Sequence, residues 1–354
     1  MDRTHDDGQH CFCAFLPPYV VRRLAESNDS NLRRVGLETV EASAIARTSR
    51  AMHVNQMQGR VPTPGLGRRR TVFDMGGQES PLPGVLRRHE GANATGIQAV
   101  DEAYDHTGTT HDFFKKVFGW ESLDGAGYPL KASVNFGCEV ANAFWEGTQM
   151  VYGAGDGEFF LSFTRSLGIT AHEMSHGVLS FTSSLVYHGE AGALNESFCD
   201  VIGISIEQYV AKTPADQACW IAGGDIVGPQ LTDVRGFRTF LNEPAFADHP
   251  ILGTDPQPKH MKDFVTDPQD NGSVHTNSGI PNHAFYLAAM AIGGNVWECA
   301  TKIWFETFTR VLNPQATFAQ AAAATEAVAR SLFGDREGDA VAQAWSDVGV
   351  TPKV

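Results

Sequence analysis

Apolar residues recur with a helical period through most of the C-terminal half of the chain, whereas the preceding stretch carries short runs typical of strands. The segments with helical spacing are 169–181, 193–210, 283–292, 297–312 and 317–333. The strand-like runs are 71–75, 131–136 and 157–163, separated by turns and by one helical stretch at 96–118. This pattern predicts an α+β protein with a β-rich N-terminal lobe and an α-helical C-terminal lobe.

The N-terminal region has a pattern of its own. Pro17-Pro18 opens a segment, up to about residue 50, in which apolar residues are again helix-spaced. Residues 51–70 carry Gly, Pro and Arg without periodicity and are typical of a linker. We therefore expect four parts, which are 1–50, a linker at 51–70, a β-rich lobe at 71–183 and a helical lobe at 184–354.

Composition and charge exclude several classes of function. The chain has 354 residues, of which 42% are hydrophobic and 19% charged, which is typical of a globular protein with a sizeable core. A net charge of −14 argues against nucleic acid as a partner, because nucleic-acid binders carry basic patches. No apolar run approaches the ~20 residues of a membrane-spanning helix, so we expect no membrane partner.

The charge is also uneven along the chain. Residues 1–70 hold 11 Arg and 7 acidic residues, a balance of +4, which leaves −18 for the remainder. The six cysteines are scattered and too few for a disulfide scaffold at this size. Residues 1–21 lack the basic and apolar regions of a secretory signal, so we expect no classical export.

The sharpest chemical signal is His172-Glu173-Met174-Ser175-His176. A spacing of four residues puts both imidazoles on one helix face, where they can bind one zinc ion. Glu173 lies beside them, within reach of a water on the metal. The alternative is a pair of histidines on a helix surface with no metal.

A catalytic zinc needs a third protein ligand and one open position. Glu196 lies 20 positions after His176 and opens a second helical pattern. Asp200 follows one helical turn later on the same face, where it could orient a ligand histidine. The alternative is a helix-capping Glu196 and a solvated Asp200.

These motifs resemble those of the thermolysin-like neutral zinc metallopeptidases. The resemblance covers about 71–350 and rests also on the segments 142–145, 150–153 and 270–280, which follow in the family's order. A related zinc aminopeptidase would have one residue fewer between the second histidine and the glutamate, and its substrate-amine motif is absent here. The resemblance implies a two-lobed thermolysin-like zincin fold with the zinc site in the cleft between the lobes.

The resemblance implies a role for each matching residue. His172, His176 and Glu196 would ligate one catalytic zinc, and Glu173 would be the general base on the zinc-bound water. The other implied roles are stabilisation of the oxyanion by His275 and Tyr187, orientation of the His275 ring by Asp270, binding of the substrate backbone by Asn142 and Arg238, and support of the ligand histidines by Asp200 and Asn195. Phe160, Phe163, Ile169 and Phe237 would line an apolar pocket for the residue after the cut, with plain core packing as the alternative.

The chain departs from the family pattern at the paired calcium site. Family acids correspond here to Gly168, Cys219, Ile221 and Gly224, and only Glu207 remains of the main acidic set. Calcium takes six to eight oxygen ligands, so we expect no calcium at the family's double site.

Residues 15–20 resemble the opening of the short propeptide in the protealysin-like branch of the family. This resemblance implies that residues 1–50 are a propeptide docked in cis, with processing near Arg50-Ala51 or near 68–70. The charge asymmetry fits such docking. A thiolate from Cys11 or Cys13 on the zinc is a further hypothesis, with a free cysteine pair as the alternative.

We therefore expect a zinc metalloendopeptidase, made as a zymogen and acting as a monomer on protein or peptide substrates. Two alternatives are a non-catalytic zinc protein that binds peptides and an exopeptidase. Family members are mostly extracellular, so we expect release by a non-classical route or by lysis, with a cytoplasmic precursor as the alternative.

Overall fold

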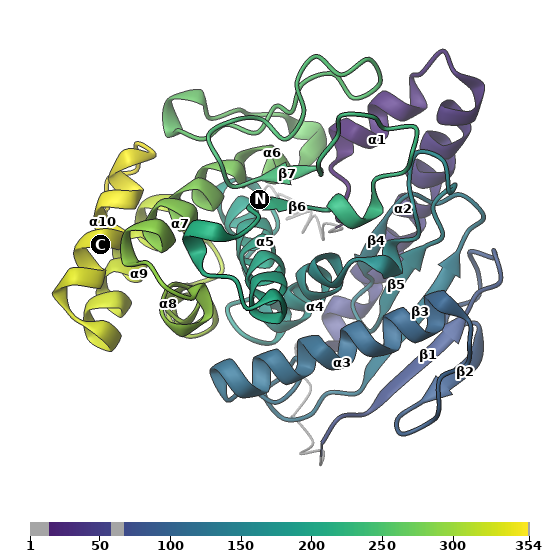
Figure 1. Ribbon diagram of the computed structural model, residues 1–354, viewed down its shortest axis with the longest axis horizontal. Coiled ribbons are helices and arrows are strands. Elements are labelled where there is room, and N and C mark those ends of the chain that lie inside the picture. The colour runs from purple at the N-terminus through teal and green to yellow at the C-terminus, as the bar shows by residue number, and fades with distance from the viewer. Residues whose placement is uncertain (1–13, 58–66, 353–354) are drawn as a thin grey trace, which may run out of the picture.

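The computed structural model describes residues 14–57 and 67–352, and two lobes are visible in it (Figure 1). Cys11 and Cys13, with the hypothesis that one of them binds zinc, lie outside the described residues. The N-terminal lobe is built on a five-stranded sheet of order β2-β1-β3-β5-β4. Its strands are β1 (Arg70–Asp74), β2 (Val85–His89), β3 (Leu130–Phe136), β4 (Ala143–Trp145) and β5 (Met150–Gly153).

The sheet is mixed, and the strand at its β4 edge contributes to the site. β1, β3 and β5 are parallel, whereas β2 and β4 pair antiparallel to their neighbours. Helix α3 (Gln98–Phe118) packs on β1 and β3 and ends at Gly119, whose φ of 68° is left-handed. β4 is the edge strand, so its outer backbone groups are available to another chain segment.

Two long helices lie between the lobes and pack against each other. They are α4 (Leu167–Phe181) and α5 (Gly189–Ala211). Ser166 caps α4 by accepting a hydrogen bond from the amide of Ile169 at 3.2 Å. A Cβ atom at Gly203 of α5 would lie 2.8 Å from the carbonyl oxygen of Gly168, so a glycine is required where these helices cross.

The C-terminal lobe is helical, as its apolar pattern predicts. Its helices are α6 (Val274–Asn277), α7 (Gly279–Ile292), α8 (Ala300–Arg310), α9 (Phe318–Phe333) and α10 (Asp335–Asp347). A short two-stranded ribbon of β6 (Ile221–Ala222) and β7 (Arg238–Thr239) precedes them in the chain. Trp304 of α8 and Trp345 of α10 stack in its core, with ring centroids 6.4 Å apart. The predicted two-lobed α+β architecture is confirmed.

The expected strand at 157–163 is wrong. Only Phe160 forms an isolated bridge, to Val227, and a single 3-10 turn follows at Phe163–Arg165. The reason is local, because the carboxylate of Asp156 accepts hydrogen bonds from the amides of Glu158, Phe159 and Phe160 and so curls the chain into a turn. Strand β2 and helix α10 were not predicted.

The helical pattern after Pro17-Pro18 forms a hairpin of α1 (Pro18–Ala25) and α2 (Ser30–Met57). A Cβ atom at Gly36 would lie 2.2 Å from the amide nitrogen of Ala25, so the two helices touch at a glycine. α2 continues past Arg50 to Met57, and this part of the expected linker is therefore helical. Ala42 and Ala46 of α2 belong to a buried apolar cluster with residues of β3, β4 and β5.

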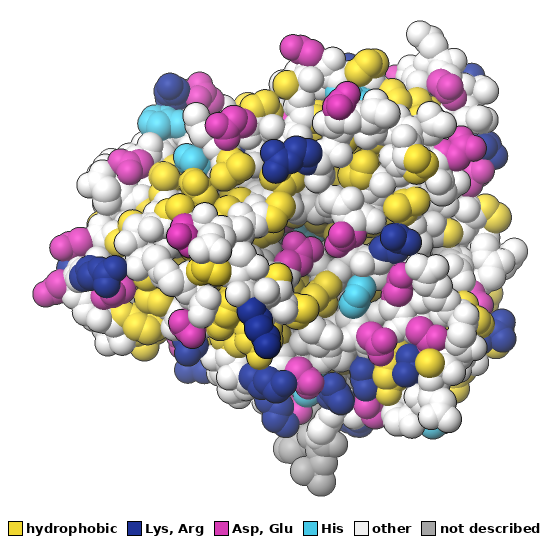
Figure 2. All heavy atoms as spheres, viewed as in Figure 1, with side chains coloured by type: hydrophobic (Ala, Val, Ile, Leu, Met, Phe, Trp, Pro, Cys, Tyr) yellow, Lys and Arg dark blue, Asp and Glu magenta, His cyan; other side chains and the backbone are white. Residues whose placement is uncertain are grey.

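Basic and acidic side chains are interspersed on the face drawn in Figure 2. None of the helices in the described ranges combines the length and apolar character needed to cross a bilayer.

Candidate active site

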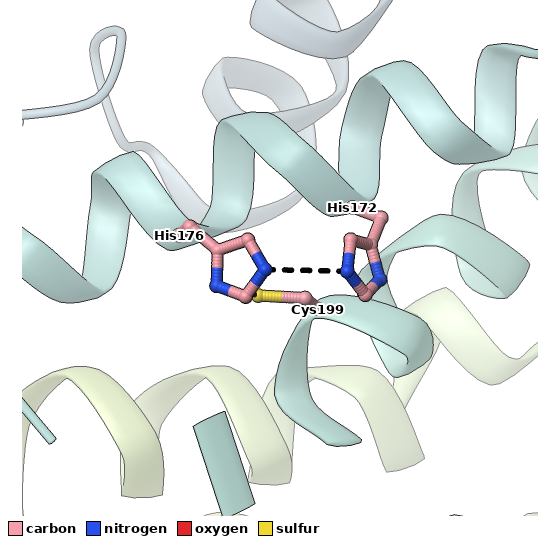
Figure 3. A group of neighbouring side chains, drawn as sticks. All are labelled: His172, His176 and Cys199. Atoms are coloured by element: carbon pink, nitrogen blue, oxygen red, sulfur yellow. Dashed lines mark hydrogen bonds between the residues drawn. The ribbon is translucent and has the colours of Figure 1, made fainter. Parts of the chain in front are cut away.

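Helix α4 presents His172 and His176 on one face, and their Nε2 atoms lie 3.2 Å apart (Figure 3). Both side chains are buried. Glu196 of α5 approaches from the other helix, with Oε2 3.6 Å from His172 Nε2 and Oε1 3.4 Å from His176 Nε2. Glu196, which is 20 positions after His176 in the sequence, therefore meets the two histidines where α4 and α5 pack together.

The spacing of these three donors fits a zinc ion. Ligands about 2.0–2.1 Å from a tetrahedral metal are roughly 3.3 Å from one another, close to the three observed separations. Oε2 of Glu196 is buried and accepts no well-directed hydrogen bond from the described residues, although Arg238 Nη1 lies 3.1 Å away. A buried carboxylate oxygen in this position suits a cation.

The second nitrogen of each histidine is held by a neighbour on α5. His172 Nδ1 lies 2.9 Å from Asp200 Oδ1, and His176 Nδ1 lies 2.8 Å from Asn195 Oδ1. An Nδ1–H that donates to these oxygens leaves each Nε2 lone pair free for a metal. The predicted supporting residues therefore lie where a zinc site needs them.

Asp200 remains an anion despite complete burial. Burial alone would raise its pKa, but the Arg238 guanidinium, 2.6 Å away, and hydrogen bonds from His172 and Asn282 hold this pKa well below its usual range. Burial likewise opposes the charge of Arg238, whose pKa is nevertheless raised by Asp200 and Glu196. Asn282, which donates to Asp200 Oδ2 at 2.8 Å, was missed from the sequence because no motif marks it.

Cys199 also lies close to the histidines, which the sequence analysis did not anticipate. Together with His172 and His176 it forms a buried group whose potential ligand atoms lie within 4.8 Å of one another. Its Sγ is, however, 3.2 Å from Nδ1 of His176, which is the ring nitrogen that points away from His172 (Figure 3). Glu196, which faces both Nε2 atoms, is therefore better placed than Cys199 to be the third ligand.

Glu173 is fully buried and anchored to the edge strand. Its Oε2 accepts a hydrogen bond from the amide of Trp145 in β4 at 2.9 Å. The carboxylate therefore lies between α4 and β4, next to the histidines on either side of it in the sequence.

Three more predicted residues converge from the C-terminal lobe. Tyr187 Oη lies 3.0 Å from His275 Nε2 and also donates to Glu196 Oε1. Asp270 Oδ1 lies 2.7 Å from His275 Nδ1 and fixes the ring. Burial opposes protonation of His275, but Glu196 and Asp270 outweigh it, so its pKa is raised.

Asn142 and Arg238 also reach the site, and each contacts the N-terminal segment. Asn142 Oδ1 accepts from the amide of Leu16 at 2.8 Å, and Arg238 Nη2 donates to the carbonyl of Phe15 at 2.5 Å. The Phe15 ring packs edge-on against His172, with centroids 5.6 Å apart. Sequence reasoning noticed residues 15–20 but did not place them in the cleft.

The four predicted pocket residues are all buried. Phe237 stacks on Phe160 with centroids 5.6 Å apart, and Phe160 stacks on Phe163. A Cβ atom at Gly223 would touch both the Phe15 ring, at 2.8 Å, and Phe237, at 3.2 Å. Phe237 is thus next to the Phe15 pocket, whereas the contacts of Phe163 fit core packing equally well.

The region of the family's calcium site has a different arrangement. Glu207 Oε1 accepts from the amide of Gly168 at 3.1 Å, and a Cβ atom at 168 would lie 2.2 Å from that oxygen. A side chain at position 168 would therefore require the Glu207 carboxylate to move. Burial and the nearby Asp225 raise the pKa of Glu207 to about 8.

The fold and the His-His-Glu donor set together define a class, the two-lobed zinc peptidases. The chain matches the thermolysin metallopeptidase catalytic domain at residues 47–180 and the thermolysin metallopeptidase alpha-helical domain at residues 183–350. It belongs to the thermolysin-like metallopeptidase family, which uses a catalytic zinc. The predictions of family, enzyme class and zinc are confirmed.

Individual relatives agree with this assignment. An "Extracellular metalloprotease" of Pectobacterium carotovorum subsp. carotovorum is 39% identical over 339 residues, which is 96% of each chain. "Thermolysin" of Alicyclobacillus acidocaldarius is 34% identical, and the match spans 80% of this chain and half of that protein. The solved precursor of protealysin, a metalloproteinase from Serratia proteamaculans, is 40% identical with a TM-score of 0.86 and covers 96% of this chain and 100% of its own.

We expect Glu196→Ala to lower zinc affinity by more than about 100-fold, because it removes one of three donors. Cys199→Ala should keep one zinc per chain, since its sulfur faces Nδ1 of His176. Metal analysis after dialysis against a buffered zinc solution measures both. Loss of zinc in the Cys199 variant with retention in the Glu196 variant would contradict the ligand set.

We expect Glu207 to destabilise the fold as the pH rises. Its folded pKa of about 8 exceeds the ordinary 4.5, so its favourable contribution is complete below pH about 4.5 and is lost as the pH rises through about 8. Glu207→Gln should therefore gain stability relative to the parent across this window, by at most about 5 kcal/mol.

Urea unfolding at a series of pH values tests this, with Glu173→Gln as the parent to prevent self-digestion. The exposed Glu243→Gln is the matched control, for which we expect no pH-dependent difference. A Glu207→Gln curve parallel to that of the parent between pH 4.5 and 8 would refute the role of burial at Glu207.

Proposed function

We propose that this protein is a zinc-dependent metalloendopeptidase that cuts internal peptide bonds before hydrophobic residues and is made as a zymogen. The observation that carries the proposal is the meeting of His172, His176 and Glu196 at ligand distances, with Glu173 anchored beside them. Each is buried, so the chemistry takes place away from bulk water.

In this proposal the residues divide the work of hydrolysis. A zinc ion held by His172, His176 and Glu196 would lower the pKa of a water bound to it and would polarise the scissile carbonyl. Glu173 accepts the proton of the attacking water and passes it to the departing nitrogen. His275 and Tyr187 donate hydrogen bonds to the oxygen on which negative charge develops, each worth about 2.7–4 kcal/mol. Asp270 keeps the His275 ring oriented.

Substrate would bind as an added strand on the edge of the sheet. Asn142 and Arg238 already hold a peptide in this way, since they bind the backbone of Leu16 and Phe15. A side chain in the position of Phe15 would sit beside His172 and Phe237 and be removed from water. Burial of such an apolar side chain is worth about 1.5–3 kcal/mol, which supports a preference for hydrophobic residues after the cut.

The N-terminal segment would be a propeptide bound in cis. We propose the parts 1–50 as propeptide, 51–70 as linker, and 71–183 and 184–354 as the two catalytic lobes. The solved relative is a precursor, which supports this division. The Arg34–Glu139 pair at 2.9 Å joins the two parts but is partly exposed and contributes little.

We further propose a monomer that acts outside the cell after non-classical release or lysis. The name of the Pectobacterium relative supports an extracellular site of action.

We expect Glu173→Gln to lower kcat/KM on casein by at least about 100-fold while zinc remains bound, because a general base typically contributes 10²–10⁴. Metal content and casein cleavage are measured on the same preparation. An active variant would remove Glu173 from the mechanism, and an inactive wild type with bound zinc would favour a non-catalytic zinc protein.

Peptides with acetylated N-termini provide a separate control. An endopeptidase cuts them internally, whereas an aminopeptidase leaves them intact. Cleavage only of the free peptides would replace the proposed activity by that of an exopeptidase.

A further inference from the structure

The N-terminal segment crosses the site beside β4. The amide of Phe15 donates to the carbonyl of Ala143 at 3.1 Å, and the amide of Leu16 donates to Asn142 Oδ1 at 2.8 Å. Phe15 thus bonds to Ala143, and the next residue, Leu16, bonds to the preceding residue, Asn142. The N-terminal segment and residues 142–143 therefore run antiparallel. Arg238 holds the carbonyl of Phe15.

The side chains on either side of the Ala14–Phe15 bond point in different directions, as in a strand. Phe15 is 1% exposed and lies between His172, Gly223 and the Arg238 guanidinium, whose Cζ is 4.8 Å from the ring centroid. Ala14 instead belongs to the buried apolar cluster that contains Phe144 of β4.

Ala14 also lies near His275. It lines a cavity of about 460 Å³ together with Asn142, Asp270 and His275. The Ala14–Phe15 peptide bond therefore lies between two parts of the site. Phe15 packs beside His172, and Ala14 shares a cavity with His275.

We propose that the Ala14–Phe15 peptide bond is the enzyme's own first substrate, cut in cis before the prosegment is released. This inference rests on the proposed function. Water adds to the carbonyl carbon of Ala14, the bond from that carbon to the Phe15 nitrogen breaks, and the nitrogen takes up a proton. The products are a carboxylate on Ala14 and an amine on Phe15, and no other reactant is consumed.

This cut differs from the one that would separate the proposed propeptide from the two catalytic lobes. Residues 15–57 remain joined to the chain, and the hairpin stays packed, for example through the hydrogen bond from the amide of Ala141 to Thr39 Oγ1 at 2.9 Å. What changes is that the Phe15 nitrogen becomes an amine and the covalent link to Ala14 is lost.

Intact mass spectrometry of the full chain tests the proposal. The chain is purified with a chelator and zinc is then added. We expect a species that lacks residues 1–14 and begins at Phe15 to appear before any cut between residues 47 and 70. Its half-time should not change on 100-fold dilution, because the bond is presented by the same molecule.

Variants of Phe15 sharpen the test. Phe15→Asp should slow the Ala14–Phe15 cut at least tenfold, whereas Phe15→Leu should keep it, since leucine also fills an apolar pocket. Leu37→Ala, on the exposed face of α2, is the matched control and should process like the wild type. Equal rates for Phe15→Asp and the wild type would overturn the proposal.

Hydrogen exchange, which needs no catalysis, checks independently which residues of the N-terminal segment are bonded to residues 142–143. In Glu173→Gln, hydrogen exchange should show protected amides at Phe15 and Leu16, and Phe15→Asp should remove this protection. Unprotected amides in Glu173→Gln would overturn the proposed register.

An added acetylated peptide distinguishes a failure of this inference from a failure of the proposed function. If the processed enzyme cuts this peptide but never the Ala14–Phe15 bond, the inference is wrong and the proposed function stands. If zinc-loaded chain cuts neither, both are wrong.

Discussion

The structure depends on charge compensation at the crossing of α4 and α5. Glu196 and Asp200 are carboxylates with no exposure to water, and Arg238 lies against both. Buried charges of this kind are tolerated only when they are paired and hydrogen-bonded. Arg238 reaches them from the β6–β7 ribbon, so the ribbon and the two helices are bound to one another by the same group that holds the donor set in place.

The same arginine links the metal site to peptide binding. Its Nη1 donates to Asp200, and its Nη2 donates to the carbonyl of Phe15. Glu173 makes a similar link, because it lies between the ligand histidines and accepts from the amide of Trp145 on the edge strand. The groups of the proposed metal site and the groups that hold the N-terminal segment are thus one connected network.

The N-terminal hairpin uses this network and also completes the fold. Its first described residues occupy the cleft, while Ala42 and Ala46 of α2 cover apolar residues of the sheet, including Phe136 and Phe144. The N-terminal hairpin is therefore held by apolar packing of α2, and the residues before it are held by hydrogen bonds to Ala143, Asn142 and Arg238. Its ion pairs, which the charge asymmetry of the sequence suggested, are partly exposed and contribute less.

The sequence by itself determined helices α4, α5, α7, α8 and α9 and the pairing of His172 with His176, because these follow from the 3.6-residue period of a single helix. Only the tertiary structure decided that Glu196 rather than Cys199 faces both Nε2 atoms, that Phe15 packs beside His172, and that the Glu207 carboxylate bonds to the Gly168 amide. The physical reason is the same in each case. These contacts join residues on different elements, and their geometry depends on how closely the elements pack, which no local period in the sequence records.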